Sequence, residues 1–374
     1  MATPSELERQ LEKRRKEIFS DRLSMSIGEI EGLYDRQELD IHPKFQRVLR
    51  WTGEQKTKLI ESVLLRIPLP PLFVAQDPDG KWDVVDGVQR IGTILEFLGV
   101  LKDKENRTLA PLELGSTKLL PALDGRTFEN KAKPELALTV AQRLDFRRSR
   151  LDLNIILKES DVSARYELFE RLNTGGSLAS PQEVRNCVLV WIDETFFDWM
   201  SSLTQVADFQ ECVQLTERLE AEQYRAELLL RFLALRTADD SVLKPMRDLG
   251  EFLNDENRRL PTDKTFKRQE AEKVFRKTFE LLSHALGADS FRRYDAGRKE
   301  FRGSFLVSAF EAVACGVAHN VQAWQKTANP SEKLAASIRK MWAQKAFTDH
   351  IGTGATGTNR IKYSVPFGRS FFAP

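Results

Sequence analysis

The sequence is poor in the residues that build disulfide frameworks and thiolate metal sites. Only three cysteines occur in 374 residues; they are widely separated, and none belongs to a CxxC pair. This pattern argues against a disulfide scaffold or a cysteine zinc site, and it fits a reducing compartment.

The sequence also lacks an excess of charge of one sign and a long apolar run. Lysine plus arginine is 57 and aspartate plus glutamate is 55, so the formal net charge is +2. This balance excludes nucleic-acid binding through overall basicity and leaves only local patches. The most apolar stretch, residues 305–318, contains Glu311 and is too short to span a bilayer. Because residues 5–18 are highly charged and unlike a secretory signal, we expect a cytoplasmic protein with no membrane partner.

What the sequence does contain is a change of pattern along the chain. Apolar residues make up 41% and charged residues 30%, which is typical of a folded globular protein. The first half has proline and glycine turns between short β-branched runs, whereas helical spacing takes over from about residue 180. We therefore predict an α+β fold with a small mixed sheet, followed by an all-helical C-terminal domain. The expected domains are 20–210 and 211–374.

The pattern also predicts individual elements. Apolar runs on either side of Asp77-Pro78-Asp79-Gly80 predict a β-hairpin of strands 72–76 and 81–86. Ser180 to Glu183 forms a capping box with proline at the first helical position. The tail from 352 is Gly/Thr-rich and then aromatic, so we expect a loop followed by a docked extension. The other helices expected are 26–34, 54–65, 88–98, 134–148, 161–172, 219–235, 268–286, 304–318 and 331–342, with strands at 38–41 and 151–157.

Residues 82–98 predict a strand, a glycine turn and a helix in immediate succession. The first turn of a helix has free N–H groups and a positive dipole end, which together attract phosphate. Gly87 permits close approach of a ligand, and the guanidinium of Arg90 suits phosphate oxygens. Gln89 is placed to orient a water, and Asp86 to hold a metal or accept a proton. The purely structural alternative makes Asp86 an N-cap and Arg90 a solvated side chain.

Two further stretches combine polar side chains with helix boundaries. Gln46 and Arg47 lie between a proline-terminated strand and a helix, and they are either a binding amide and cation or exposed side chains. Residues 173–176 read Asn-Thr-Gly-Gly, and Arg185 lies in the helix that follows. This loop is either an anion-binding nest or a plain connection between helices.

Two clusters of basic residues depart from the overall charge balance. The first comprises Arg143, Arg147, Arg148 and Arg150. The second comprises Arg292, Arg293, Arg298, Lys299 and Arg302, with aromatic residues interleaved. Phosphate contact combined with aromatic stacking makes the second cluster a candidate DNA-binding surface. The alternative for both is an ordinary solvated face, which we favour for the first cluster.

A series of short motifs follows in order over roughly residues 25–190. The motifs are Phe45-Gln46-Arg47, Trp51, Leu59-Ile60-Glu61-Ser62, Ile67-Pro68-Leu69-Pro70-Pro71, Val85-Asp86-Gly87-Val88-Gln89-Arg90, Phe169-Glu170-Arg171-Leu172-Asn173-Thr174-Gly175-Gly176 and Pro181-Gln182-Glu183-Val184-Arg185-Asn186. In type and order they resemble the motifs of the GmrSD-type restriction endonuclease N-terminal domains. The resemblance implies a ParB/sulfiredoxin-like fold for the N-terminal domain.

The resemblance further implies a nucleotide-binding, often nucleotide-hydrolysing, domain in bacterial defence against modified phage DNA. The family motif is Asp-Gly-Gln-Gln-Arg, and Val88 stands where its first glutamine is usual. Binding of a nucleoside triphosphate with Mg²⁺ is thus implied, whereas hydrolysis is left open. The implied catalytic residues are Asp86, Gln89 and Arg90, with Asp86 also the metal ligand. The implied nucleotide contacts are Gln46, Arg47, Gly87, Gln89, Arg90, Asn173 and Arg185.

Multidomain members of this family add a C-terminal His-Asn-His nuclease. The four histidines of this chain, His42, His284, His319 and His350, show no pattern of a ββα metal site. DNA cleavage would then need a separate nuclease subunit. Two alternatives to the nucleotide-binding role stay open: a non-enzymatic DNA-sensing or scaffold subunit, and a nuclease acting through the N-terminal domain.

Overall fold

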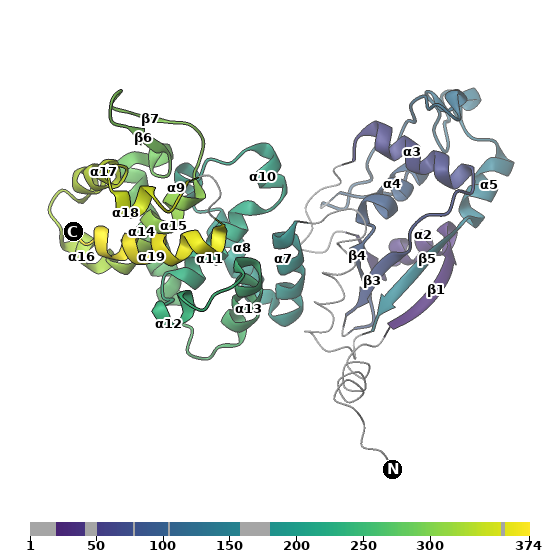
Figure 1. Cartoon of the computed structure of the whole chain (residues 1–374). Coiled ribbons are helices and arrows are strands. Elements are labelled where there is room, and N and C mark those ends of the chain that lie inside the picture. Colours follow the sequence, from purple (N-terminus) through teal and green to yellow (C-terminus); the bar gives the residue numbers. More distant parts are fainter. Residues whose placement is uncertain (1–19, 42–50, 78, 104, 158–179, 353–355) are drawn as a thin grey trace, which may run out of the picture. The chain divides into compact units, whose positions relative to one another are not determined.

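The chain divides into two compact units, residues 1–179 and 180–374 (Figure 1). A computed structural model describes residues 20–41, 51–77, 79–103, 105–157, 180–352 and 356–374. The division falls at Ser180, whereas the sequence pattern places a domain boundary at 210–211. Helix α7 (Pro181–Ile192) belongs to unit 2 because it packs against α8 (Glu194–Thr204) and α13 (Leu249–Thr262).

Unit 1 is a mixed sheet with helices, as the sequence predicts. The strands follow the order β1-β5-β3-β4-β2. β1 and β4 run antiparallel to their neighbours β5 and β3, while β5 runs parallel to β3 and β2 parallel to β4. The strands are β1 (Ser20–Ser26), β2 (Leu39–Asp40), β3 (Leu72–Gln76), β4 (Trp82–Asp86) and β5 (Arg150–Ile156). The helices are α2 (Ile27–Asp35), α3 (Gly53–Leu64), α4 (Val88–Leu98) and α5 (Val140–Arg148), with 3₁₀ turns η1 (Pro121–Leu123) and η2 (Pro134–Leu136).

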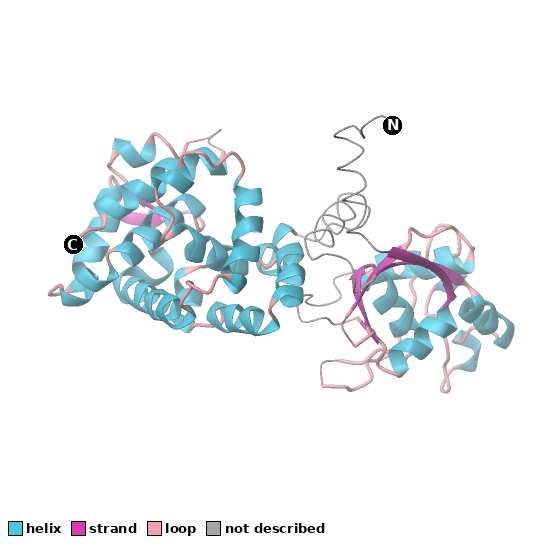
Figure 2. Cartoon of the chain, turned by 90° about the horizontal axis from the view of Figure 1, so that it is seen from below, coloured by secondary structure: helices cyan, strands magenta, loops and turns pink. Residues whose placement is uncertain are grey.

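The sheet is curved, and the helices of unit 1 lie to one side of it (Figure 2). Alternate residues of the strands face these helices: Val74, Val84 and Leu153 are buried together with Ile60 and Leu95. The predicted β3–β4 hairpin is confirmed, and β4 runs directly through Gly87 into α4. The carboxyl end of β4 and the start of β3 therefore share one edge, where Phe73 pairs with Asp86.

Unit 2 is built mainly of helices (Figure 1). Its α-helices are α7, α8, α9 (Ala207–Cys212), α10 (Glu217–Ala221), α11 (Tyr224–Leu235), α12 (Asp240–Leu243), α13, α14 (Arg268–Leu286), α15 (Val307–His319), α16 (Val321–Lys326), α17 (Pro330–Met341), α18 (Lys345–Thr348) and α19 (Gly357–Phe371), with a 3₁₀ turn η3 (Gly287–Asp289). The capping box at Ser180 is confirmed, since its hydroxyl accepts from the N–H of Glu183. All three cysteines are free and buried. No helix of the described residues is long and apolar enough to cross a membrane.

One expectation for this unit is wrong. The C-terminal region is not all-helical, because β6 (Arg293–Asp295) and β7 (Glu300–Arg302) form an antiparallel hairpin. Its strands are only three residues long and too short to give a periodic signal, and Tyr294 pairs with Phe301 across them. The expected docked extension beyond residue 356 is present as a helix, α19, which packs against α15 and contains Pro366.

Helices α15 and α19 cross at two glycines. A Cβ atom added at Gly316 would lie under 3 Å from the carbonyl oxygen of Gly368. One added at Gly368 would similarly clash with the backbone of Ala312. The two helix backbones therefore touch directly, and only glycine fits at these positions.

Candidate functional site

The junction of β4 and α4 has the predicted strand–turn–helix geometry. Gly87 is the N-cap of α4, with φ of 100° in the left-handed region, and no side chain caps this helix among the described residues. A side chain at Gly87 would collide with Leu72, which packs against the turn. Glycine is therefore required by the backbone conformation and by Leu72, a reason that differs from the expected close approach of a ligand.

Arg90 is not solvated but is held by the protein itself. Its guanidinium pairs with the carboxylate of Asp86 at 3.0 Å and donates to the carbonyl oxygens of Pro70 and, at 3.3 Å, Pro71. The side chains of Arg90 and Asp86 are only 11% and 18% exposed. Burial lowers the pKa of Arg90, and the charge of Asp86 partly opposes this effect. The guanidinium thus ties the first turn of α4 to the proline-rich segment before β3.

The neighbouring motif residues have structural roles as well. The side-chain oxygen of Gln89 accepts a hydrogen bond from the backbone N–H of Trp51 at 3.2 Å, which fixes the entry to α3. Val88 packs into the core of unit 1 and is 9% exposed. Position 88 therefore faces the core here. Gln46, Arg47 and Asn173 lie outside the described residues.

The predicted metal role of Asp86 stays a prediction. Within the described residues, no group of three or more His, Cys, Asp or Glu side chains is arranged to hold a metal ion. The carboxylate of Asp86 already pairs with Arg90. Mg²⁺ is commonly held by one or two carboxylates and substrate phosphates, so a single carboxylate fits only a metal that arrives with a nucleotide.

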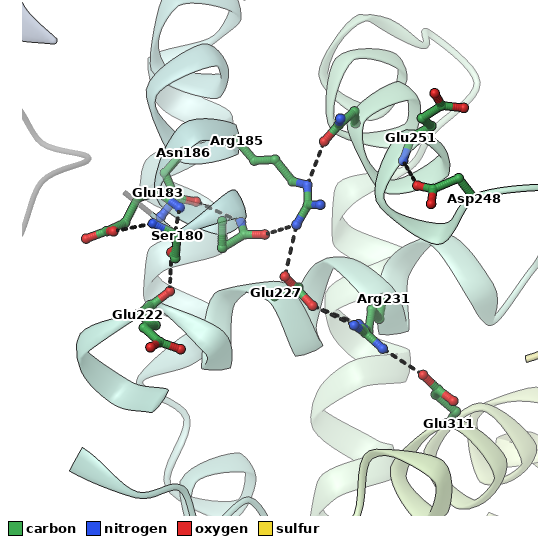
Figure 3. A network of polar contacts seen from close by, with 12 residues as sticks. Ser180, Glu183, Arg185, Asn186, Glu222, Glu227, Arg231, Asp248, Glu251 and Glu311 are labelled. Carbon is green, nitrogen blue, oxygen red and sulfur yellow. Dashed lines mark hydrogen bonds and ion pairs between the residues drawn. The ribbon is translucent and has the colours of Figure 1, made fainter. Parts of the chain in front are cut away.

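Arg185 lies in unit 2 within a buried polar network (Figure 3). It is 3% exposed and bonds Glu227 at 3.0 Å, Asn254 at 2.8 Å and Gln182 at 3.2 Å. Its backbone carbonyl accepts from Asn257. Arg185 therefore joins α7 to α11 and α13, and its place in a nucleotide pocket stays a prediction.

The network continues from Glu227 through Arg231 to Glu311 (Figure 3). Arg360 pairs with Glu311 and extends it further. Arg231 bonds both glutamates, and Arg360 approaches Glu311 at 2.7 and 2.9 Å. Burial disfavours the charged form of Glu227, but the positive charges of Arg231 and Arg185 outweigh it and lower the pKa of Glu227. Three arginines and two glutamates thus form one buried chain of ion pairs, a feature that sequence spacing alone did not reveal.

The second basic cluster lies on and around the β6–β7 hairpin. The ring centroids of Tyr294 and Phe301 lie 5.0 Å apart across the two strands, and the rings are tilted relative to each other. Arg292 is used structurally, pairing with Asp289 and donating to the carbonyl of Gly303. Arg302 has two looser carboxylate neighbours, Glu300 at 3.4 Å and Asp295 at 4.0 Å.

Three cations of this cluster are exposed and make no ion pair with any described residue: Arg293, Arg298 and Lys299. A fourth cation comes from α17, where the guanidinium of Arg339 lies 6.0 Å from the ring of Phe301. Sequence reasoning missed Arg339 because it lies far from the hairpin in the chain, and only the fold brings it to Phe301.

These observations define unit 1 as a mixed α/β domain with a glycine-turned strand–helix junction. Residues 30–190 match the family described as GmrSD restriction endonuclease, N-terminal domain. This match confirms the resemblance to the GmrSD-type restriction endonuclease N-terminal domains that the motifs of this part of the chain predict. The match ends within α7, beyond the division between the two units. No curated protein matches the chain significantly.

Proposed function

We propose that unit 1 binds a nucleoside triphosphate at the start of α4, as part of a restriction or phage-defence system. The observation that carries the proposal is the N-terminus of α4, which no side chain of the described residues caps and which has Arg90 in its first turn. Such a helix start supplies N–H groups and a positive dipole end to phosphate oxygens. A ParB/sulfiredoxin-like fold would place the phosphates at the same strand–helix junction.

Arg90 would act in this proposal as a preorganised cation. A guanidinium has five N–H groups, and three contacts hold it to Asp86, Pro70 and Pro71. A charged group already fixed in place loses less side-chain entropy when it contacts phosphate. When bound, Mg²⁺ would neutralise phosphate charge beside Asp86. Gln46, Arg47 and Asn173 would complete the pocket.

We expect the double variant Gln89→Ala/Arg90→Ala to bind nucleoside triphosphate at least about tenfold more weakly than the parent chain, because it loses a charge-assisted contact to phosphate. Isothermal calorimetry with ATP and GTP, each with Mg²⁺, measures this. Arg147→Ala is the matched control, since it removes another ion-paired arginine of unit 1, the partner of Glu31. Equal affinity in the parent and the double variant would exclude this motif as the site.

Hydrolysis is a separate question, tested by phosphate release. Val88→Gln restores the usual family motif, and turnover gained by this variant would assign the chemistry to position 88. Because Val88 packs in the core, a thermal melt must accompany the assay.

We propose that unit 2 contacts DNA through the β6–β7 hairpin. Arg293, Arg298 and Lys299 are exposed cations, and Arg339 lies against the same hairpin. Exposed cations without carboxylate partners are suited to backbone phosphates, whereas Arg292 is already engaged by Asp289.

We expect the triple variant Arg293→Gln/Arg298→Gln/Lys299→Gln to weaken duplex DNA binding and to flatten its salt dependence. Each lost phosphate contact lowers the slope of log K against log salt by about 0.9. Fluorescence anisotropy between 50 and 200 mM salt, about the range in which such slopes are resolved, measures both effects. The control variant, Arg247→Gln/Lys264→Gln/Lys267→Gln, removes three exposed cations elsewhere in unit 2. An equal loss in both variants would show that the hairpin has no special role.

A further inference from the structure

The first basic cluster separates into two kinds of arginine in the structure. Arg143 donates to the carbonyl of Leu138 at 2.7 Å and lies 3.6 Å from Glu129. Arg147 makes two bonds to the carboxylate of Glu31, at 2.9 and 3.1 Å. Arg143 and Arg147 therefore serve to stabilise the fold of unit 1.

The other two arginines of that cluster line a pocket of about 420 Å³ together with Arg66. They come from separate elements, because Arg66 follows α3, Arg148 ends α5 and Arg150 begins β5. No described carboxylate forms an ion pair with any of the three, and Arg150 makes only a long bond of 3.4 Å to the carbonyl of Ser24. We call this cavity the triple-arginine pocket.

The charge of the triple-arginine pocket is unbalanced. Asp145 is the single carboxylate among the residues that line it, against three guanidinium groups. A ligand with two negative charges would neutralise the difference. The planar fork of a guanidinium matches the oxygens of phosphate, and a phosphate monoester carries nearly two charges at neutral pH.

The backbone at Arg66 also points to a role for its side chain. Arg66 has φ of 56°, in the left-handed region that favours glycine. The N–H groups of Arg66 and Ile67 bond the carbonyls of Val63 and Ser62, which completes a Schellman motif at the end of α3. Glycine is the usual residue at this position of the motif, and arginine occupies it here at a conformational cost.

Apart from Asp145 and Ser149, the remaining walls of the pocket are apolar and include Val63, Ile67 and Leu151. A second pocket of about 440 Å³ adjoins it and shares Val63 and Arg66. This second pocket is lined mainly by apolar side chains, among them Leu120, Leu123, Leu138 and Phe146. An anionic group at the arginines would therefore have room for an organic body beside it.

We infer that the triple-arginine pocket binds the phosphate group of a small phosphorylated organic molecule, whose body extends toward the adjoining apolar pocket. This site goes beyond the proposed function, because its lining residues do not include Asp86 to Arg90. The segment between the two sites is continuous: residues 67–69 line the pocket, and the carbonyls of Pro70 and Pro71 hold Arg90.

The test is calorimetric titration of the full chain with inorganic pyrophosphate and with ADP. The variant Arg66→Gln/Arg148→Gln/Arg150→Gln should bind pyrophosphate at least about tenfold more weakly than the parent, because several charge-assisted bonds are lost. The matched control, Lys118→Gln/Lys131→Gln/Lys133→Gln, removes three exposed cations from other parts of unit 1 and should bind like the parent. ADP should bind more tightly than pyrophosphate if the adjoining pocket takes up its organic part.

The same titrations in the Gln89→Ala/Arg90→Ala background separate the two sites. Pyrophosphate binding that persists there and disappears with the triple-arginine variant supports the pocket, whatever becomes of the nucleotide proposal. The inference is wrong if the parent chain binds neither ligand, or if the control loses as much affinity as the pocket variant. If the three arginines only stabilise the carbonyl ends of α3 and α5, the triple-arginine variant should have a lower melting temperature but an unchanged affinity for pyrophosphate. This outcome would also overturn the inference.

Discussion

Replacing Glu311 by alanine is expected to lower the free energy of unfolding of unit 2 by about 3–5 kcal/mol. Glu311 is fully buried and accepts bonds from both Arg231 and Arg360. Its removal leaves Arg360 without a carboxylate partner among the described residues, and leaves Arg231 with Glu227 alone. An uncompensated buried guanidinium costs far more than the ion pair contributes, because its solvation is not restored. Chemical denaturation followed by tryptophan fluorescence measures the loss.

Two further variants test this explanation. Glu332→Ala removes an exposed glutamate from α17 and should change stability by less than about 0.5 kcal/mol. The double variant Glu311→Ala/Arg360→Ala should lose less free energy of unfolding than the two single variants lose together. The reason is that each single variant leaves the other charged group without its partner, and the double variant removes both groups. Strict additivity would show that the two side chains do not interact.

Replacing Gly368 by alanine is expected to lower the free energy of unfolding by about 2–4 kcal/mol. The added methyl group would meet the backbone of Ala312 in α15, and a backbone cannot move aside as a flexible side chain can. The helices must separate, and the packing of α15 with α19 is lost along their contact. Thermal and urea unfolding of the full chain both report this change.

Gly352→Ala is the matched control, because a Cβ there meets no atom within 4 Å. It should leave stability within about 0.5 kcal/mol of the parent. Gly316→Ala should resemble Gly368→Ala, since it faces the same crossing from the other helix. If Gly368→Ala were as stable as Gly352→Ala, the close approach of the two backbones would be wrong.

Local signals in the sequence predict much of unit 1. The Asp-Pro-Asp-Gly turn indicates the β3–β4 hairpin, and Gly87 marks the passage from β4 to α4, where its left-handed φ requires glycine. These features depend on neighbouring residues, so spacing and turn chemistry are sufficient to find them. β1 was missed, because residues 20–26 read Ser-Asp-Arg-Leu-Ser-Met-Ser and become a strand only by pairing with β5.

Contacts between distant residues explain what the sequence could not show. Arg90 looks like an exposed cation in the motif, yet the carbonyls of Pro70 and Pro71 come from a segment twenty residues earlier. The buried Arg185 likewise bonds Glu227, which lies forty-two residues further along the chain, so local spacing cannot indicate this pair. Within the first basic cluster, spacing cannot separate Arg147 from Arg148, although Glu31 engages only the former.

The position of α7 has a practical consequence for isolating the family domain. A fragment cut to residues 30–190 would carry most of α7 away from α11 and α13. Arg185 would then lose Glu227 and Asn254, and apolar residues such as Val188 would be exposed to solvent. Such a fragment would be prone to aggregate, whereas a fragment ending just before Ser180 would lack α7 altogether and would not expose these residues.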